Sequence, residues 1–522
     1  MTASADLVVT NAEVHTLADP DETHEALAVR DGSIVRVGDA YEIEFLDGVD
    51  TKVVDCDGGV VIPGFVDAHT HLEMVGRHLV HADLRDVDSA EAAVDRLRER
   101  AAETDGPVLG YGYDESTWDE ARYLIREDLD AVATDRPVVA FREDMHTASV
   151  NTAALDAHRD AMPEADVHTQ GGEPTGVVVE EAVDPLFAAV EPDVAGTEEL
   201  VRAAQRRANE LGVTEVHDMC RGSHKPRVYR DLDAAGELSL RVRLNYWTDH
   251  LDAVLETGLR SGHGSDRVEM GAVKTYTDGS FGGRTAKVTA PYADAPDGDD
   301  GSGSAESGSG AATGRWVVDP EELEAFVADA AAANLQFTAH AIGDAAVAGV
   351  LDVFERHEAE RLRHRVEHAE LLDDELVERF AEVGAVASVQ PNFLKWAREG
   401  GLYESRLGER RREVMPFRDL LNAGVPLAFG SDCMPLDPLF GVQQAVTAPE
   451  PRQRLTVTEA LRAYSRGGAY AAGAEAERGT VAVGKCADLV VLDESPWEVD
   501  PAAIADIDVT HTVVGGDVVY ER

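Results

Sequence analysis

Five side chains that bind metal ions well each lie at the end of a predicted strand: His69, His71, His340, His368 and Asp432. On a strand, residues two apart point to the same face, so both imidazoles of His69-Thr70-His71 can reach one ion. A lone histidine is more often a core residue than a ligand, but four of the eighteen histidines lie at strand ends. Asp432 could instead cap a helix or a turn. Beside four imidazoles it is better interpreted as a metal-bound carboxylate and general base.

Lys274 is a second unusual feature, because the chain contains only six lysines. It lies within a predicted strand at residues 268–278, where a buried ammonium group is costly unless it is paired or used chemically. The alternative to a chemical role is a salt bridge to Asp278 or to another local carboxylate. The four cysteines are far apart and form no CxxC pair, so a metal here must be bound by histidine and carboxylate.

The elements that must position these residues alternate between strand and helix. Helical periodicity follows most of the strands, as at residues 320–334 and 373–383. This pattern predicts an α/β protein with a (β/α)8 TIM-like barrel, whose active site lies at the carboxyl ends of the strands. The eight predicted strands are residues 60–69, 214–219, 240–247, 268–278, 336–342, 364–369, 385–391 and 426–432.

The remaining segments predict further parts around this barrel. The sequence pattern at both ends of the chain predicts short strands with turns. Because chain termini often lie close together, this favours a small β-sandwich domain built from residues 1–62 and 475–522. The alternative is two unrelated terminal extensions. The barrel then covers residues 63–474, with residues 72–212 inserted after its first strand as a lid or subdomain. Residues 294–314 are rich in Gly, Ser, Asp and Ala, which predicts a disordered loop.

Composition excludes several classes of partner. With 47 basic and 100 acidic residues the net charge is −53, which repels nucleic acid and anionic membranes. Acid dispersed along the chain, with few lysines, is typical of proteins from extreme halophiles. No run of about eighteen apolar residues occurs. Residues 1–6 lack the pattern of a signal peptide, so we expect a cytoplasmic protein.

The order HxH, Lys, His, His, Asp resembles the amidohydrolase superfamily of metal-dependent hydrolases, over nearly the whole chain. The closer resemblance is to the branch that contains the N-substituted formamide deformylases. Two segments carry it: HTASVNTAAL at residues 146–155 and DGSFGGRTA at residues 278–286. The resemblance also covers five further segments: NAEVHT at residues 11–16, PGFVDAHTH at 63–71, GEPTG at 172–176, HAIGD at 340–344 and GKCADL at 484–489.

The resemblance implies a ligand set of His69, His71, His340, His368 and Asp432, which would bind one or two divalent ions, with Zn²⁺ expected. Lys274 would bridge two ions as a carbamate formed with CO₂. If Lys274 is unmodified, one ion bound by His69, His71, Asp432 and one further histidine is the simpler site. Substrate contacts are expected from His146, Asp278 and Arg284; for His146 and Arg284 the alternative is packing of the lid.

These observations predict an enzyme that hydrolyses a non-peptide carbon–nitrogen bond, of amide or formamide type, in a small molecule. A metal-activated hydroxide would attack the carbonyl, with Asp432 as the base. A cyclic amide, a lactone or an ester would suit the same site. A third hypothesis is a catalytically silent barrel used for binding, although such a protein is expected to lose its ligands. A homodimer is the commonest symmetric assembly.

Overall fold

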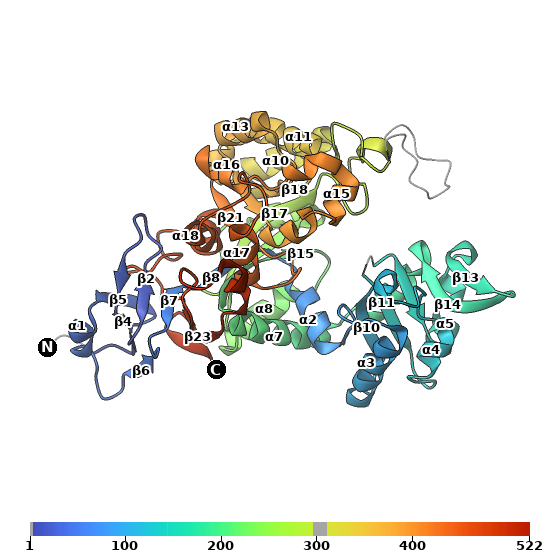
Figure 1. Cartoon of the computed structure of the whole chain (residues 1–522), viewed down its shortest axis with the longest axis horizontal. Coiled ribbons are helices and arrows are strands. Elements are labelled where there is room, and N and C mark those ends of the chain that lie inside the picture. Colours follow the sequence, from blue (N-terminus) through green and yellow to red (C-terminus); the bar gives the residue numbers. More distant parts are fainter. Residues whose placement is uncertain (1–3, 144, 296–310) are drawn as a thin grey trace. The chain divides into compact units, whose positions relative to one another are not determined.

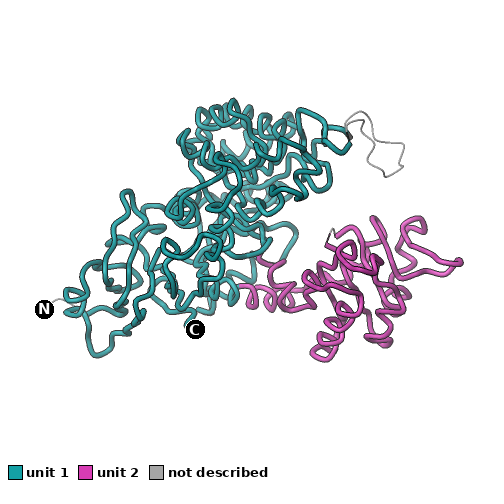
Figure 2. The backbone as a smooth tube through the Cα atoms, in the orientation of Figure 1, with its two compact units in different colours: residues 1–71, 205–522 teal, residues 72–204 magenta. Residues whose placement is uncertain are grey.

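The computed structural model describes residues 4–143, 145–295 and 311–522 (Figure 1). The chain divides into two compact units, Met1–His71 with Gln205–Arg522, and Leu72–Ala204 (Figure 2). The predicted insertion thus begins at the same residue as the second unit but extends beyond its end. Most of the predicted loop at residues 294–314 falls outside the described residues. No described helix is both long enough and apolar enough to span a bilayer.

The first unit contains a sheet of eight parallel strands, one from each predicted segment, arranged in chain order. Its first and last strands approach each other, since the backbone N–H of Asp432 donates to the carbonyl of His69 over 2.8 Å. The sheet is therefore a nearly closed barrel, as expected of a TIM barrel. The strands are β8 (Phe65–Thr70), β15 (Val213–Cys220), β16 (Arg241–Trp247), β17 (Val268–Tyr276), β18 (Gln336–Ala341), β19 (Arg365–His368), β20 (Val386–Val389) and β21 (Leu427–Phe429).

Amphipathic helices follow the strands of the barrel. In α13 (Asp374–Val383) the buried residues include Val377 and Phe380, one turn apart on one face. The side chain of Asp373 caps the start of this helix, and Gly384, with φ of +71°, ends it in the left-handed conformation. The other helices include α8 (Lys225–Ala235), α9 (Leu251–Thr257), α10 (Pro320–Ala332), α11 (Asp344–Phe354), α16 (Phe417–Asn422) and α17 (Pro438–Val446).

The first predicted strand, residues 60–69, is wrong as a single element. Its first part, β7 (Val60–Pro63), pairs antiparallel with β22 (Leu489–Leu492) near the other end of the chain, and only β8 enters the barrel. Gly64 separates the two strands. A Cβ atom at Gly64 would lie 2.3 Å from Cγ2 of Thr214, so this close approach to β15 requires glycine.

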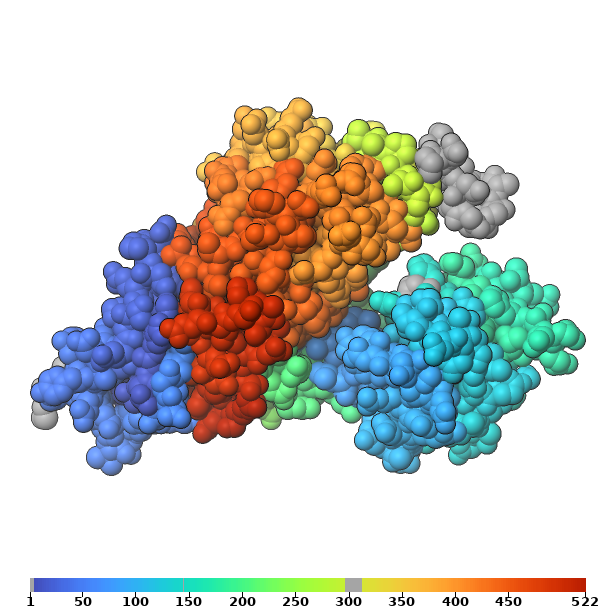
Figure 3. Space-filling model, viewed as in Figure 1, coloured from blue at the N-terminus to red at the C-terminus, as the bar shows by residue number. Residues whose placement is uncertain are grey.

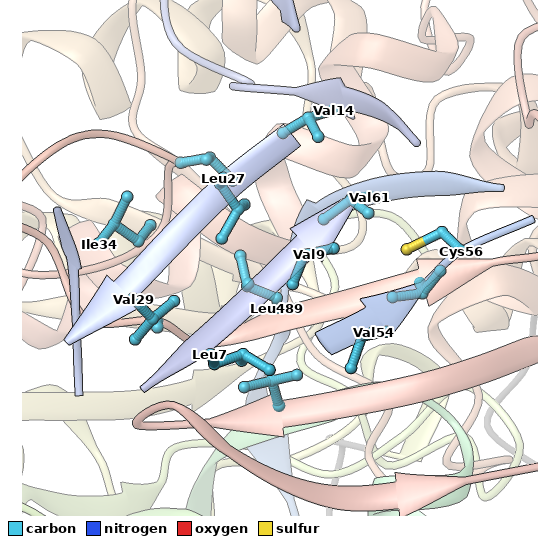
Figure 4. Close-up of a cluster of buried hydrophobic side chains, with 14 residues drawn as sticks. Leu7, Val9, Val14, Leu27, Val29, Ile34, Val54, Cys56, Val61 and Leu489 are labelled. Carbon is cyan, nitrogen blue, oxygen red and sulfur yellow. The ribbon is translucent and has the colours of Figure 1, made fainter. Parts of the chain in front are cut away.

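Strands from both ends of the chain share one sheet in the order β24-β23-β22-β7-β2-β3. A four-stranded sheet in the order β5-β4-β1-β6 shares an apolar cluster with it, which includes Val9, Leu27, Val61 and Leu489 (Figure 4). In Figure 3 the red C-terminal residues lie against the blue N-terminal ones. The remaining strands of these sheets are β1 (Leu7–Thr10), β2 (Glu13–His15), β3 (Thr23–His24), β4 (Ala26–Arg30), β5 (Ser33–Gly38), β6 (Lys52–Asp55), β23 (Val509–Val514) and β24 (Asp517–Glu521).

The second unit has its own six-stranded mixed sheet, in the order β13-β14-β12-β11-β10-β9. Two apolar clusters draw on alternate residues of its central strands: Val139 and Phe141 of β11 belong to one, and Val138 and Ala140 to the other. The unit is thus a folded domain with a core on each face of its sheet. Its elements include β9 (Ala82–Asp83), α3 (Ala90–Glu103), β10 (Val108–Tyr113), β11 (Val138–Arg142), β12 (Thr147–Val150), α5 (Thr152–His158), β13 (Val167–Gln170) and β14 (Glu173–Val179).

Candidate metal centre and substrate pocket

The end of β8 brings the first two histidines to Asp432. Nε2 of His69 lies 3.6 Å from Oδ1 of Asp432, and Nε2 of His71 lies 3.4 Å from the same oxygen. One ligand atom from each of the three residues lies within 4.8 Å of the others, close enough to hold one metal ion. Asp67 connects the first strand of the barrel to the segment after its last strand. Its Oδ1 accepts hydrogen bonds from the backbone N–H groups of His69 and Ser431.

His340 and His368 end the neighbouring strands β18 and β19 on the same side of the barrel. The His368 ring centroid lies 4.9 Å from that of His69 and 4.4 Å from that of His340. Burial lowers the pKa of His340 to about 3 and that of His368 well below its usual range. Both imidazoles are therefore neutral near pH 7, the form that binds metal ions. His368 also has a φ of +72°, a strained conformation of the kind found at functional sites.

Asp432 follows β21 after the buried residues Phe429, Gly430 and Ser431. Its φ is +50°, so the backbone turns sharply where its carboxyl group reaches the cluster. Burial raises the pKa of Asp432, while the nearby His69 and Lys274 oppose this shift. The carboxyl side chain is 18% exposed, which leaves it accessible from the open end of the barrel.

Lys274 lies on β17 with its amino group buried, and Nζ has no hydrogen-bond partner among the described residues. Nζ lies 5.7 Å from the ring centroid of Trp247 and 5.8 Å from that of Tyr276. Burial lowers the pKa of Lys274 to about 8. Among the described residues Lys274 forms no salt bridge to Asp278 or to another carboxylate, and only the charges of Glu367 and Asp432, at longer range, favour its ammonium form against the cost of burial.

Unsatisfied buried atoms test whether a metal fits this cluster. Nδ1 of His340, Nδ1 of His368 and Nζ of Lys274 are all buried and unpartnered in the described part of the chain. A buried donor or acceptor left without a partner costs about 1–3 kcal/mol. A divalent ion held by imidazole and carboxylate would satisfy the histidine nitrogens, and this donor set suits Zn²⁺ and its neighbours in the transition series.

Glu367 is a central residue that the sequence analysis missed. It is fully buried on β19. Its Oε2 accepts a hydrogen bond of 2.6 Å from Nδ1–H of His69, and its Oε1 accepts a hydrogen bond from the hydroxyl group of Thr338. Burial opposes ionisation, but Arg365 and His69 hold the pKa of Glu367 well below its usual range. The sequence could have indicated Glu367, because it is a charged residue within the predicted strand segment RVEH at residues 365–368, and a buried charge needs a partner.

We expect Glu367→Gln to weaken metal binding by about 10–100-fold, because His69 would lose the carboxylate that orients its ring. Competition with a chromophoric chelator measures the change. The exposed residue Glu378 provides the matched control, and Glu378→Gln should bind metal as the wild type does. An unchanged affinity in folded Glu367→Gln would contradict a role for Glu367 in orienting His69.

A pocket of about 230 Å³ adjoins the cluster on one side, and His340, His368 and Asp432 form part of its wall. Aromatic and aliphatic side chains make up most of the rest. Within it, Glu370 is only 2% exposed, and the hydroxyl of Tyr403 donates to its Oε2 over 2.6 Å. Burial raises the pKa of Glu370 to about 8. The other lining residues are Ser280, Phe281, Gly282, Ile342, Phe393, Trp396, Leu402, Tyr403 and Met434.

Two of the predicted substrate-binding residues do not line this pocket but contact its wall: Oδ1 of Asp278 lies 3.5 Å from Nε2 of His340, and the backbone N–H of Arg284 donates to the carbonyl of Phe281. The buried carboxyl group of Asp278 accepts backbone hydrogen bonds from Lys287, Ile342 and Gly343, which hold the loop after His340. Arg284 forms a two-point ion pair with Asp294. These contacts give both residues a structural role, and their contact with substrate stays a prediction.

The third predicted substrate-binding residue, His146, belongs to the second unit. It precedes β12, is 71% exposed at its side chain, and lies 3.2 Å from a carboxylate oxygen of Glu180. Its role at the substrate stays a prediction as well.

Comparison with known proteins assigns the chain to a family and identifies several similar proteins. The model of the amidohydrolase family matches residues 52–520. The Bacillus subtilis protein YtcJ is 31% identical, over 98% of both chains. An N-substituted formamide deformylase from Arthrobacter pascens is 27% identical over 100% of this chain and 99% of its own. The crystal structure of an uncharacterized metal-dependent hydrolase from Pyrococcus furiosus has a TM-score of 0.80 and 28% identity, covering 94% of this chain and all of that one.

Proposed function

Because this chain belongs to the amidohydrolase family, we propose that it is a metal-dependent hydrolase that cleaves a carbon–nitrogen bond of amide or formamide type in a small molecule. One observation carries the proposal. Four imidazoles and one carboxyl group converge at the carboxyl ends of the barrel strands, beside a pocket of small-molecule size. The similarity to an N-substituted formamide deformylase along its whole length supports the formamide type of bond.

His69, His71 and Asp432 would hold one divalent ion such as Zn²⁺, and His340 with His368 would complete that site or hold a second ion. A bound divalent ion lowers the pKa of water toward 7 and polarises a carbonyl group. Lys274, whose amino group has no hydrogen-bond partner among the described residues, would react with CO₂ and release a proton to form a carbamate that helps to hold the metal. Glu367 keeps the ring of His69 in the required orientation.

The chain supplies the proton transfers and the binding surface. Asp432 accepts the proton that water loses as its oxygen bonds to the carbonyl carbon. It then delivers a proton to the leaving nitrogen as the carbon–nitrogen bond breaks, so that an acid and an amine are released. The apolar walls formed by Phe281, Phe393 and Trp396 bind the substituent and exclude water from it.

The proposal is tested on protein purified without chelators, by metal analysis and by assays with formamides, amides, lactones and esters. We expect one or two divalent ions per chain and hydrolysis of amide-type substrates. Where the wild type binds two ions, Lys274→Met should lower the metal content to about one. Hydrolysis of esters or lactones alone would contradict the proposed bond. Bound metal without any turnover would favour a binding protein.

An origin in high salt is part of the proposal and rests on the net charge of −53. Repulsion among the excess carboxylates destabilises the folded state at low ionic strength, and salt screens it over a Debye length of about 3 Å at 1 M. We expect the melting temperature to rise by at least about 10 °C between 0.1 and 3 M KCl. A melting temperature that does not change with KCl would contradict a halophilic origin.

A further inference from the structure

Apart from Ser280 and the cluster residues His340, His368 and Asp432, the described wall of the pocket beside the metal cluster is apolar except for one buried polar pair, Glu370 and Tyr403. Glu370 lies two residues after His368, and its carboxyl group faces the pocket that His368 and Asp432 also line. Tyr403, on helix α15 (Leu402–Leu407), is 3% exposed. Buried polar groups are costly unless their hydrogen bonds are made. A carboxyl group in this position therefore indicates a specific partner.

Within the described part of the chain, only one of the two carboxyl oxygens of Glu370 forms a hydrogen bond. Oε2 accepts the hydrogen bond from the hydroxyl group of Tyr403, and the described residues offer no other hydrogen bond to this carboxyl group. In either protonation state an oxygen of the group can accept a further hydrogen bond. The pair thus presents an acceptor to whatever occupies the pocket.

The surroundings hold this acceptor in place. The ring of Tyr403 packs edge-on against Phe281, with centroids 5.2 Å apart, and lies 6.1 Å from the ring centroid of Trp396. The backbone carbonyl of Glu370 accepts a hydrogen bond of 2.6 Å from Met415. A rigid acceptor loses little entropy on binding and discriminates well between ligands with and without the matching donor.

The proposed function sets which part of a substrate reaches Glu370. A carbonyl group attacked at the cluster of His69, His71 and Asp432 leaves its nitrogen and the nitrogen substituent to fill the adjoining pocket. In this arrangement the substituent contacts the aromatic rings of the pocket, and the amide nitrogen lies beside the carboxyl group of Glu370. An amide that carries one N–H and one apolar substituent matches this arrangement.

We infer that Glu370, positioned by Tyr403, accepts a hydrogen bond from the N–H group of the substrate, so that the enzyme selects secondary amides with an apolar nitrogen substituent. This inference rests on the proposed function. Tertiary amides, with two substituents on nitrogen, have no N–H to donate and would leave the buried oxygen without a partner. Such a loss costs at least tenfold in specificity, about 1.4 kcal/mol.

The test compares N-phenethylformamide with N-methyl-N-phenethylformamide on the metal-loaded enzyme. We expect the wild type to prefer the secondary amide by at least tenfold in kcat/KM. The double variant Glu370→Leu/Tyr403→Phe replaces both partners by apolar groups of similar shape, which preserves folding best. It should lose the preference while keeping its metal content, whereas Tyr403→Phe alone should keep part of it. The exposed residue Glu399 provides the control Glu399→Leu, which should retain the full preference.

Calorimetric binding of the two compounds gives a second readout that does not depend on turnover. If the wild type hydrolyses neither compound and no other amide of the panel, the proposed function fails, but a preference in binding that disappears in the double variant would still support the role of Glu370. Equal kcat/KM and equal affinity for both compounds in the wild type would overturn the inference. So would a preference that the double variant keeps.

Discussion

His69→Ala should lose most of its bound divalent metal and at least about 10³-fold in kcat/KM, equivalent to about 4 kcal/mol. His69 lies beside Asp432 and His368, and its Nδ1–H donates a hydrogen bond to Glu367. Its loss removes one ligand and leaves the carboxylate of Glu367 buried without that partner. Elemental analysis of protein purified in high salt measures the metal, and circular dichroism checks the fold.

The control for this experiment is His263→Ala, which removes an exposed histidine of the same unit. It should keep both metal and activity. Full metal content in folded His69→Ala would show that the ion is held elsewhere. Wild-type protein without any metal, although never exposed to chelators, would overturn the hydrolytic proposal and favour the binding protein.

Asp432→Asn should retain much of its metal but lose at least about 10³-fold in kcat. The amide of asparagine still offers an oxygen ligand, but it cannot accept a proton at neutral pH. The expected loss therefore falls on the proton transfer rather than on metal binding. Steady-state kinetics with metal analysis of the same sample separates the two effects.

A control for the charge change is Asp374→Asn, since the side chain of Asp374 is 91% exposed. This variant should match the wild type. If Asp432→Asn holds its metal and stays within about tenfold of the wild-type rate, roughly 1.4 kcal/mol of barrier, Asp432 is not the base. If the variant loses both metal and activity, Asp432 is a ligand of the metal. The pH dependence of kcat in the wild type then measures its contribution to proton transfer.

Much of the barrel and of the metal cluster follows from local sequence patterns. The strands β15 to β21 could be predicted because short apolar runs and turn residues are features of neighbouring positions. Because parallel strands of a barrel end on one side, His340 and His368 could be assigned to one site without knowledge of any contact. Lys274 stood out because a charged residue within an apolar strand needs a chemical or electrostatic reason.

The features that only the tertiary structure decided depend on contacts between distant residues. Gly64 divides two strands because Thr214 of β15 packs against it, and no local pattern contains that neighbour. The pair of His69 and Glu367 joins residues 298 positions apart. Likewise Glu370 and Tyr403 meet only when α15 folds over the end of β19. The sequence by itself thus determined which side chains of metal-binding type lie at the ends of the barrel strands. Folding decided how those side chains are oriented and which of them meet, because burial and hydrogen bonding depend on neighbours far away in the chain.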